Sequence, residues 1–249
     1  GAYSVFERWY ARTVLSCACR RGYTILAPSR KTVEDVLSFA QKKTLPAPSI
    51  AETPLGISFA PITQSVQQNS TPNFLCVGRV EKKKQTDKTI CIFSAWAALH
   101  PECTHRLLIV GKPGFLYEDA VRAREESPVK DRIVFCGFVS DSDMKKMYAE
   151  ASLTFFLSSY EGFGFPVLES IVSGTPVLLT DAGSLRAFGF SGVFYTDPEN
   201  VSGVIRDIER IVAEKKDALV PVAVREKIAR EYSWVRTAKL TCKVLLHTT

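Results

Sequence analysis

Two glutamates, Glu161 and Glu169, are the side chains of this sequence whose type and spacing best suit chemistry. Seven residues separate them, including glycines and Pro166. The apolar run 153–157 before them is typical of a buried strand, and proline suits the first turn of a helix, where its missing N–H costs nothing. Glycine lets the backbone approach a ligand, a helix start favours phosphate, and carboxylates accept hydrogen bonds from vicinal hydroxyls. The segment therefore predicts a strand–loop–helix site for a phosphorylated ligand that carries a sugar ring or a ribose.

This block, written as E-x7-E, resembles the donor-site motif of the retaining glycosyltransferases of family 4, which have the two-domain GT-B fold. The flanking segments 158–160, 173–177 and 183–185 keep the order and spacing of that family. The resemblance implies that Glu161 binds hydroxyls of the transferred sugar and that Glu169 binds the ribose diol. It also implies that backbone amides between them hold the distal phosphate. The donor-binding residues implied in this stretch are Gly162, Phe163, Gly164, Phe165, Pro166 and Val167.

A basic loop follows the predicted strand 74–77, and the resemblance gives two of its cations a role. The family carries a Gly-Arg pair with a lysine five residues past the arginine, which here are Gly78, Arg79 and Lys84. A departing nucleoside diphosphate accumulates negative charge, which arginine and lysine can stabilise without a divalent metal. Arg79 and Lys84 are therefore expected to act with Glu161 in catalysis, and Gly78 to lie against the donor. The neighbouring lysines have the composition of a solvated basic loop.

Two more turns follow predicted strands, and each has two interpretations. Gly111 comes after the strand 107–110 and resembles a turn that lies beside the donor in the family, but it also suits a simple turn. Phe138 and Val139 follow the strand 133–136. In the family the backbone at this point contacts the base, whereas packing in the core would also explain the phenylalanine. Both alternatives stay open at each turn.

Neither of two clusters with metal-compatible side chains predicts a metal site. Asp141 and Asp143 have the D-x-D spacing that holds a divalent ion in another glycosyltransferase fold, but Asp141 or Ser140 directly precedes the helical run 144–150 and can cap it. Residues 100–105 contain His, Glu and Cys without a known ligand spacing. We therefore expect no obligatory metal and no cofactor, with the nucleotide sugar as co-substrate. The resemblance implies same-face attack, in which the leaving phosphate accepts the proton and no protein nucleophile is needed.

The composition is typical of a globular protein without membrane spans or a disulfide scaffold. The 249 residues are 46% hydrophobic and 23% charged, with a net charge of +6. No apolar stretch approaches the ~20 residues of a spanning helix, and the start has no signal-peptide pattern. The seven cysteines include no C-x-x-C pair. These features predict a cytoplasmic protein and leave peripheral contact with the inner face of a membrane open.

From residue 73 onward, apolar strands alternate with helical segments, which is typical of a parallel sheet with helices on both faces. The predicted strands are 74–77, 107–110, 133–136, 153–157, 177–179 and 193–195. Together with the resemblance, this gives an α/β fold class. We expect a Rossmann-like GT-B C-terminal, donor-binding domain at 73–249, a linker at 54–72 and a remnant of the N-terminal acceptor domain at 1–53. The remnant is expected to contain two helices with one strand, 23–27, between them.

The resulting hypothesis is a retaining glycosyltransferase, or its donor-binding part, that transfers a sugar to a glycan or lipid-linked acceptor. GDP-mannose is favoured over UDP-sugars as the donor, because many relatives with the segment 160–164 use it. The alternative is a non-catalytic nucleotide-sugar-binding module that needs a separate acceptor domain. Nucleic acid is not expected as a partner, because Lys and Arg are scattered and no reader motif is present.

Overall fold

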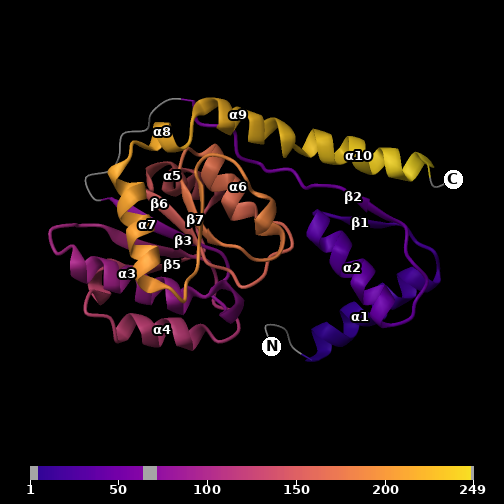
Figure 1. The fold of residues 1–249 in the computed structure, drawn as a ribbon, viewed down its shortest axis with the longest axis horizontal. Coiled ribbons are helices and arrows are strands. Elements are labelled where there is room, and N and C mark those ends of the chain that lie inside the picture. Colours follow the sequence, from indigo (N-terminus) through magenta and orange to yellow (C-terminus); the bar gives the residue numbers. More distant parts are fainter. Residues whose placement is uncertain (1–4, 64–71, 248–249) are drawn as a thin grey trace. The chain divides into compact units, whose positions relative to one another are not determined.

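The structure is a computed structural model, and it describes residues 5–63 and 72–247. Contacts divide the chain into two compact units (Figure 1). The larger unit is Phe59–Arg230, and the smaller unit combines Gly1–Ser58 with Glu231–Thr249. Most of the polar part of the predicted linker, 64–71, lies outside the described residues. The predicted domain boundaries stay a prediction.

The larger unit is built on a six-stranded parallel sheet in the order β5-β4-β3-β6-β7-β8. Its strands are β3 (Asn73–Val77), β4 (Arg106–Val110), β5 (Ile133–Gly137), β6 (Leu153–Phe156), β7 (Val177–Thr180) and β8 (Val193–Thr196). Each strand begins and ends within one residue of a strand predicted from the apolar runs. The predicted Rossmann-like α/β fold class is therefore confirmed.

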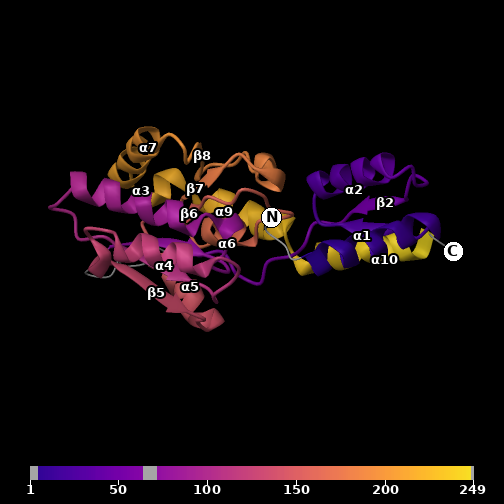
Figure 2. The same cartoon turned by 90° about the horizontal axis from the view of Figure 1, so that it is seen from below.

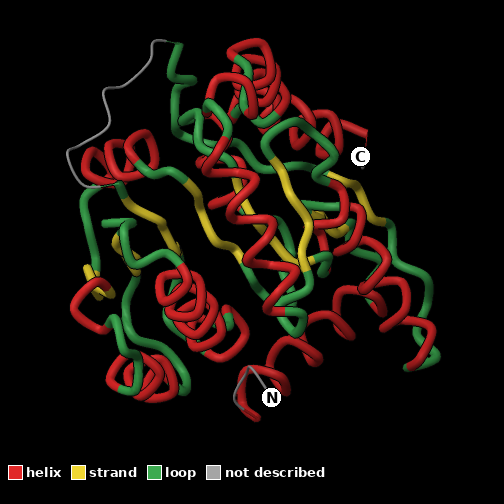
Figure 3. The backbone as a smooth tube through the Cα atoms, turned by 60° about the vertical axis from the view of Figure 1, so that its left-hand side comes forward, coloured by secondary structure: helices red, strands yellow, loops and turns green. Residues whose placement is uncertain are grey.

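Helices cover both faces of this sheet (Figure 3). The helices that follow the first strand of this sheet are α3 (Thr86–Leu99), α4 (Tyr117–Glu125), α5 (Asp141–Glu150), α6 (Phe165–Val172), α7 (Val201–Ala213), α8 (Lys216–Leu219) and α9 (Val222–Glu231). Helix α3 packs against α4 and α7, whereas α5 packs against α6. Three short 3₁₀ segments, η1 (Lys82–Lys84), η2 (Lys130–Arg132) and η3 (Gly183–Ala187), lie in the connections.

The apolar runs form strands because both faces of the sheet are buried. Every residue of β6 and β7 is buried, so their sequences are apolar apart from Thr154 and Thr180 and do not alternate between apolar and polar residues. Phe74 of β3 lies near the centre of the core, with its ring 4.9 Å from that of Trp96 and 5.6 Å from that of Phe155. Packing of α3 on the sheet thus fixes the strand that precedes the basic loop.

The strand order reverses between β3 and β6, because the chain continues outward from β3 to β5 and then returns to the other side. In parallel α/β sheets a ligand crevice forms at such a point, beyond the carboxyl ends of the strands. We call this side of the sheet the carboxyl edge and the opposite side the amino edge. The loops after β3, β4, β5, β6 and β7 all leave from the carboxyl edge. These loops carry nearly all the predicted site residues.

The smaller unit contains a two-stranded parallel sheet (Figure 2). Its elements are α1 (Val5–Arg20), β1 (Ile25–Ala27), α2 (Arg30–Lys42), β2 (Ile50–Glu52) and α10 (Trp234–His247). The expectation of a single strand here was wrong, since β2 pairs with β1. Strand β2 has only three residues and follows a proline-rich segment, so periodicity gave no signal for it.

The end of the chain folds into the smaller unit beside residues 54–58. The Ile57 N–H donates to the Tyr232 carbonyl over 2.8 Å. The Thr237 hydroxyl donates to the Pro54 carbonyl over 2.7 Å. A Cβ on Gly56 would lie 2.2 Å from the backbone nitrogen of Trp234, so only glycine allows this approach. Among residues 5–63 and 72–247, no helix has the length and apolar character needed to cross a bilayer.

Candidate functional site

The loop between β6 and α6 has the strand–loop–helix arrangement predicted for the E-x7-E segment. Helix α6 begins at Phe165 with Pro166 in its first turn. Gly164 has φ +102°, and a Cβ there would lie 2.9 Å from side-chain carbons of Leu185 and Phe188. Only glycine fits this position, which fixes the start of α6 at the carboxyl edge. The unpaired N–H groups of a helix start favour an anion there.

Lys84 and Glu161, 77 residues apart in the chain, form an ion pair at the carboxyl edge. The Lys84 Nζ lies 2.5 Å from Oε1 of Glu161, and the two side chains are only 14% and 12% exposed. The ammonium group also lies 4.5 Å from the centre of the Phe156 ring. The loops that carry the pair follow the neighbouring strands β3 and β6, where the strand order reverses. The structure therefore brings together two of the three predicted catalytic residues.

The turn after β7 holds the backbone of Glu161. The Ser184 N–H donates to the Glu161 carbonyl over 2.9 Å. Gly183 has φ +61°, and a Cβ there would lie 2.5 Å from the same carbonyl oxygen. The hydroxyls of Ser158 and Ser184 are buried without a hydrogen-bond partner within the described part of the chain. Buried polar groups are rarely left unpaired, so these hydroxyls keep hydrogen-bonding capacity for water or a ligand.

Glu169 on α6 is held by a side chain that the sequence did not indicate. The Tyr148 hydroxyl, on α5, donates to Oε2 of Glu169 over 3.2 Å. Burial raises the pKa of Glu169, and the hydrogen bond from Tyr148 opposes that shift. Burial also raises the pKa of Tyr148 well above its usual value, so the phenol stays a donor at neutral pH. A buried tyrosine has the same sequence pattern as any aromatic residue of the core. The sequence analysis therefore did not identify Tyr148 as part of the site.

Arg79, the third predicted catalytic residue, lies on the loop after β3 with an exposed side chain. Its Nε donates to the Pro113 carbonyl over 3.4 Å, and the guanidinium forms no ion pair with any residue that the structure describes. The loops after β3 and β4 meet at Gly111, which has φ +150°. A Cβ on Gly111 would lie 2.0 Å from the Gly78 carbonyl oxygen. The close approach accounts for the glycine, and a donor contact at Gly111 stays a prediction.

Phe138 exposes 75% of its surface at the turn after β5, so its interpretation as a core residue was wrong. The Lys112 Nζ lies 5.1 Å from the centre of its ring. The two residues come from the loops after the neighbouring strands β4 and β5. Val139 beside them is half-buried. The exposed Phe138 ring and the Lys112 ammonium group at the carboxyl edge could both contact the base of a nucleotide. Contact of Phe138 and Val139 with that base stays a prediction.

The family described as Glycosyl transferases group 1 matches residues 62–224, a range that includes every predicted site residue. The chain belongs to this family. Mannosylfructose-phosphate synthase of Agrobacterium fabrum (strain C58) is 30% identical over 154 residues, which are 56% of this chain and 34% of that protein. The serotype-specific mannosyltransferase WbdA of Escherichia coli is 24% identical over 178 residues, which are 71% of this chain and 21% of that protein. The matched parts thus span about a third or less of these relatives.

Solved structures show the fold of this chain. Sucrose-phosphate synthase from Thermosynechococcus elongatus superposes with a TM-score of 0.76 at 19% identity, covering 96% of this chain and 62% of that chain. Anabaena Alr3699/HepE, solved in complex with UDP and glucose, has a TM-score of 0.75 at 16% identity, covering 97% and 69%. The predicted GT-B fold is therefore confirmed. The assignment to family 4 stays a prediction.

The Asp141 and Asp143 pair lies at a helix start. Helix α5 begins at Asp141, and the Ser140 hydroxyl accepts a hydrogen bond from the Asp143 N–H over 3.1 Å. Carboxylates in a first turn also complement the positive end of the helix. Of the two predicted capping residues, Ser140 caps the helix, whereas Asp141 is its first residue.

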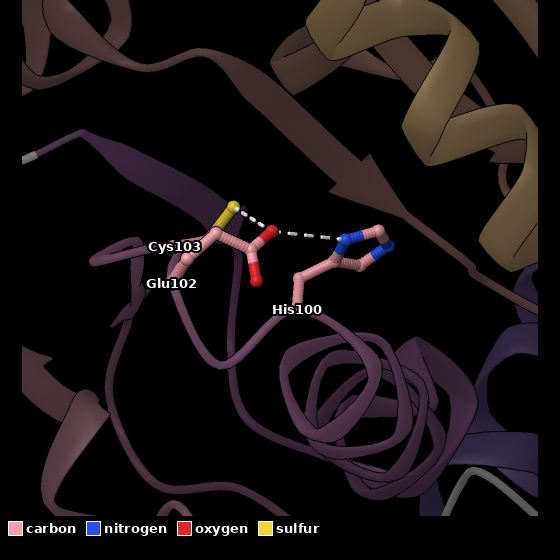
Figure 4. Close-up of side chains that lie close together, drawn as sticks. All are labelled: His100, Glu102 and Cys103. Carbon is pink, nitrogen blue, oxygen red and sulfur yellow. Dashed lines mark hydrogen bonds and ion pairs between the residues drawn. The ribbon is translucent and has the colours of Figure 1, made fainter.

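The second cluster lies between α3 and β4, at the amino edge (Figure 4). The Glu102 carboxylate lies 3.7 Å from Sγ of Cys103 and 3.5 Å from Nδ1 of His100. The other ring nitrogen of His100 lies 2.9 Å from the Glu209 carboxylate of α7. The three candidate ligand atoms lie within 4.8 Å of one another, yet Glu102 is 70% exposed. The His100 imidazole lies between the carboxylates of Glu102 and Glu209. These contacts link α3 to α7 at the surface and need no metal ion to explain them.

Proposed function

We propose that this glycosyltransferase binds a nucleoside-diphosphate sugar at its carboxyl edge and transfers the sugar, with retention of anomeric configuration, to a glycan or lipid-linked acceptor. It does so alone or as the donor-binding part of a larger protein. The observation that carries the proposal is the partly buried Lys84–Glu161 pair beside the start of α6. A cation suited to phosphate and a carboxylate suited to sugar hydroxyls meet there within one hydrogen-bond length.

The pairing also supports a proposal for how the two side chains respond when the donor binds. Lys84 and Glu161 neutralise each other before the donor binds, so neither is left as a partly buried charge without a partner. When the donor binds, Lys84 turns to the diphosphate together with Arg79, and Glu161 accepts hydrogen bonds from the sugar. Both cations then stabilise the charge of the departing diphosphate. Its phosphate oxygen accepts the proton of the acceptor, with no protein nucleophile and no divalent metal in the proposed mechanism.

The choice of donor rests on the named relatives. WbdA is a mannosyltransferase by name, as is the O-antigen chain mannosyltransferase B of Escherichia coli, 26% identical over 176 residues. We therefore propose GDP-mannose first and UDP-sugars second, the latter supported by the UDP and glucose bound in HepE. A polysaccharide acceptor fits the O-antigen relative. A lipid-linked acceptor would place the reaction at the cytoplasmic face of a membrane.

A panel of nucleotide sugars tests donor binding directly. We would measure thermal unfolding and calorimetric binding with GDP-mannose, UDP-glucose, UDP-N-acetylglucosamine and ADP-glucose. A true donor at 100 times its Kd is expected to add ~2.7 kcal/mol to the free energy of unfolding. No stabilisation by any of the four would contradict the proposal.

The alternative, a binding module without catalysis, differs in turnover. Release of nucleoside diphosphate by the chain alone, with or without acceptor, would favour the enzyme. Donor binding without release would favour the module. Where a product forms, its anomeric configuration by proton NMR tests retention, and an inverted product would contradict the proposed mechanism.

A further inference from the structure

A partly buried hydrogen bond joins helices α5 and α6. The Tyr148 hydroxyl donates to Oε2 of Glu169 over 3.2 Å. Glu169 is the proposed ribose ligand, whereas the resemblance gives Tyr148 no role. The contact therefore links a residue of the core to one that faces the proposed donor.

Tyr148 is held firmly on all sides. Its side chain is fully buried, and its ring meets the Phe59 ring edge-on at 5.8 Å and 73°. Its carbonyl accepts a hydrogen bond from the Thr175 hydroxyl over 2.5 Å. These contacts fix the position of the phenol oxygen, and the hydroxyl can rotate about the C–O bond to donate to Oε2 of Glu169.

Glu169, by contrast, depends on this contact. Its side chain is partly buried, and burial raises its pKa toward the neutral, protonated form. The bond from Tyr148 favours the ionised form, while the charge of Asp141 opposes it. No donor to Oε1 of Glu169 is found among residues 5–63 and 72–247, so one carboxylate oxygen is held and the other is available.

We infer that Tyr148 is a positioning residue for donor recognition: its phenol holds Oε2 of Glu169 so that the ionised carboxylate presents Oε1 to the vicinal diol of a ribonucleotide. The inference rests on the proposed function, because it assigns the available oxygen to the donor. It adds to that function a determinant that lies outside the E-x7-E segment. Without the phenol, the carboxylate would rotate and would be protonated at a higher pH.

The test is the substitution Tyr148→Phe, which removes only the hydroxyl. We expect calorimetric Kd values for GDP or UDP, whichever binds the wild type more tightly, to rise about tenfold at pH 7.5, as for loss of a hydrogen bond to a charged group. The loss should grow as the pH falls toward 5, because the variant carboxyl protonates earlier. Tyr117→Phe is the matched control, since the Tyr117 ring packs against Phe135 and takes no part in the contacts of Glu169.

Two further measurements separate positioning from a general effect on folding. The 2′,3′-dideoxy form of the same diphosphate has no diol. Its Kd should therefore be higher than that of the ribonucleotide in the wild type, and the same in the wild type and in Tyr148→Phe. The pKa of the Glu169 carboxyl, followed by carbon NMR on glutamate-labelled protein, should be higher in the variant. Equal losses with the ribo and dideoxy ligands would indicate a structural role and overturn the inference.

The failure of this inference and the failure of the proposed function give different results. A wild-type protein that binds neither diphosphate would overturn the proposed function and, with it, the use assigned to Oε1. A wild type that binds, paired with a Tyr148→Phe variant whose Kd and Glu169 pKa are unchanged, would overturn the role of Tyr148 alone.

Discussion

The Lys84–Glu161 pair at the carboxyl edge of the six-stranded sheet and the His100–Glu102–Cys103 cluster at its amino edge differ in how far their side chains are exposed. At the carboxyl edge the Lys84 and Glu161 side chains are 14% and 12% exposed. At the amino edge Glu102 is 70% exposed, and its neighbours lie on one short turn. Enclosure requires distant segments to converge, which costs stability unless the charges are paired. The comparison teaches that convergence and burial, rather than charge or residue type, distinguish the candidate site from this surface cluster.

The largest effect is expected where the loops of the carboxyl edge touch. Gly111→Ala would place a Cβ 2.0 Å from the Gly78 carbonyl oxygen in a backbone with φ +150°. We expect the free energy of unfolding to fall by at least about 2 kcal/mol, measured by urea denaturation. Gly189→Ala is the control, because nothing lies within 4 Å of its Cβ position. Similar small losses in both variants would show that the two loops separate easily.

Removing the enclosed cation tests the same edge through activity. Lys84→Ala is expected to lower turnover at least about tenfold, since it removes one charge that stabilises the departing diphosphate. Glu161→Ala should lower it by a similar factor. Lys88→Ala serves as the control, because Lys88 pairs with the exposed Glu199 outside the site. Donor-dependent product formation measures all three, and wild-type rates in Lys84→Ala and Glu161→Ala would remove the roles proposed here.

Acid should act on the amino edge through His105. Burial, with a smaller effect of Arg132, lowers the pKa of this histidine from 6.5 to about 4. Because the folded-state pKa is the lower one, the unfolded chain binds the proton first, and stability falls as the pH drops from 6.5 toward 4. After screening by solvent, we expect a loss on the order of 1 kcal/mol that His105→Leu lacks. Equal pH dependence of unfolding in both proteins between pH 7 and 4 would contradict the burial argument.

The smallest effect is expected for the exposed group of the amino edge. Glu102→Gln should leave Tm within about 2 °C of the wild type and leave turnover unchanged, because solvated surface pairs contribute little. A chelator should likewise leave turnover unchanged. If a chelator lowered the Tm of the wild type but not that of Glu102→Gln, an ion would be bound at His100, Glu102 and Cys103. Both edges of the sheet would then carry a ligand site.

Local patterns predicted the parts of the fold that depend on neighbouring residues. Continuous apolar runs gave the strands, Pro166 gave the start of α6, and the polar residues at 140–143 gave a capped helix. Contacts between residues that are distant in the sequence could not be predicted from these local patterns. The resemblance named Lys84 and Glu161, but only the reversal of strand order explains why they touch.

The missed features have physical reasons of the same kind. Tyr148 was missed because a donor buried in the core has the same sequence signature as a packing residue. Phe138 is exposed although it follows an apolar strand, because Gly137 with φ +64° turns the chain away from the sheet. In each case the deciding contact or direction is set by tertiary structure rather than by local sequence.

The way in which Gly56 packs against Trp234 has a practical consequence for anyone who shortens this polypeptide. The first 58 residues share their compact unit with the last 19, from Glu231 to Thr249, so one cut after Ser58 yields no intact piece. A version that ends at Arg230 would lose the partners of Pro54, Gly56 and Ile57 while keeping every residue of the sheet. Isolating the sheet therefore calls for two cuts, and isolating the remainder calls for a new peptide link between its two halves.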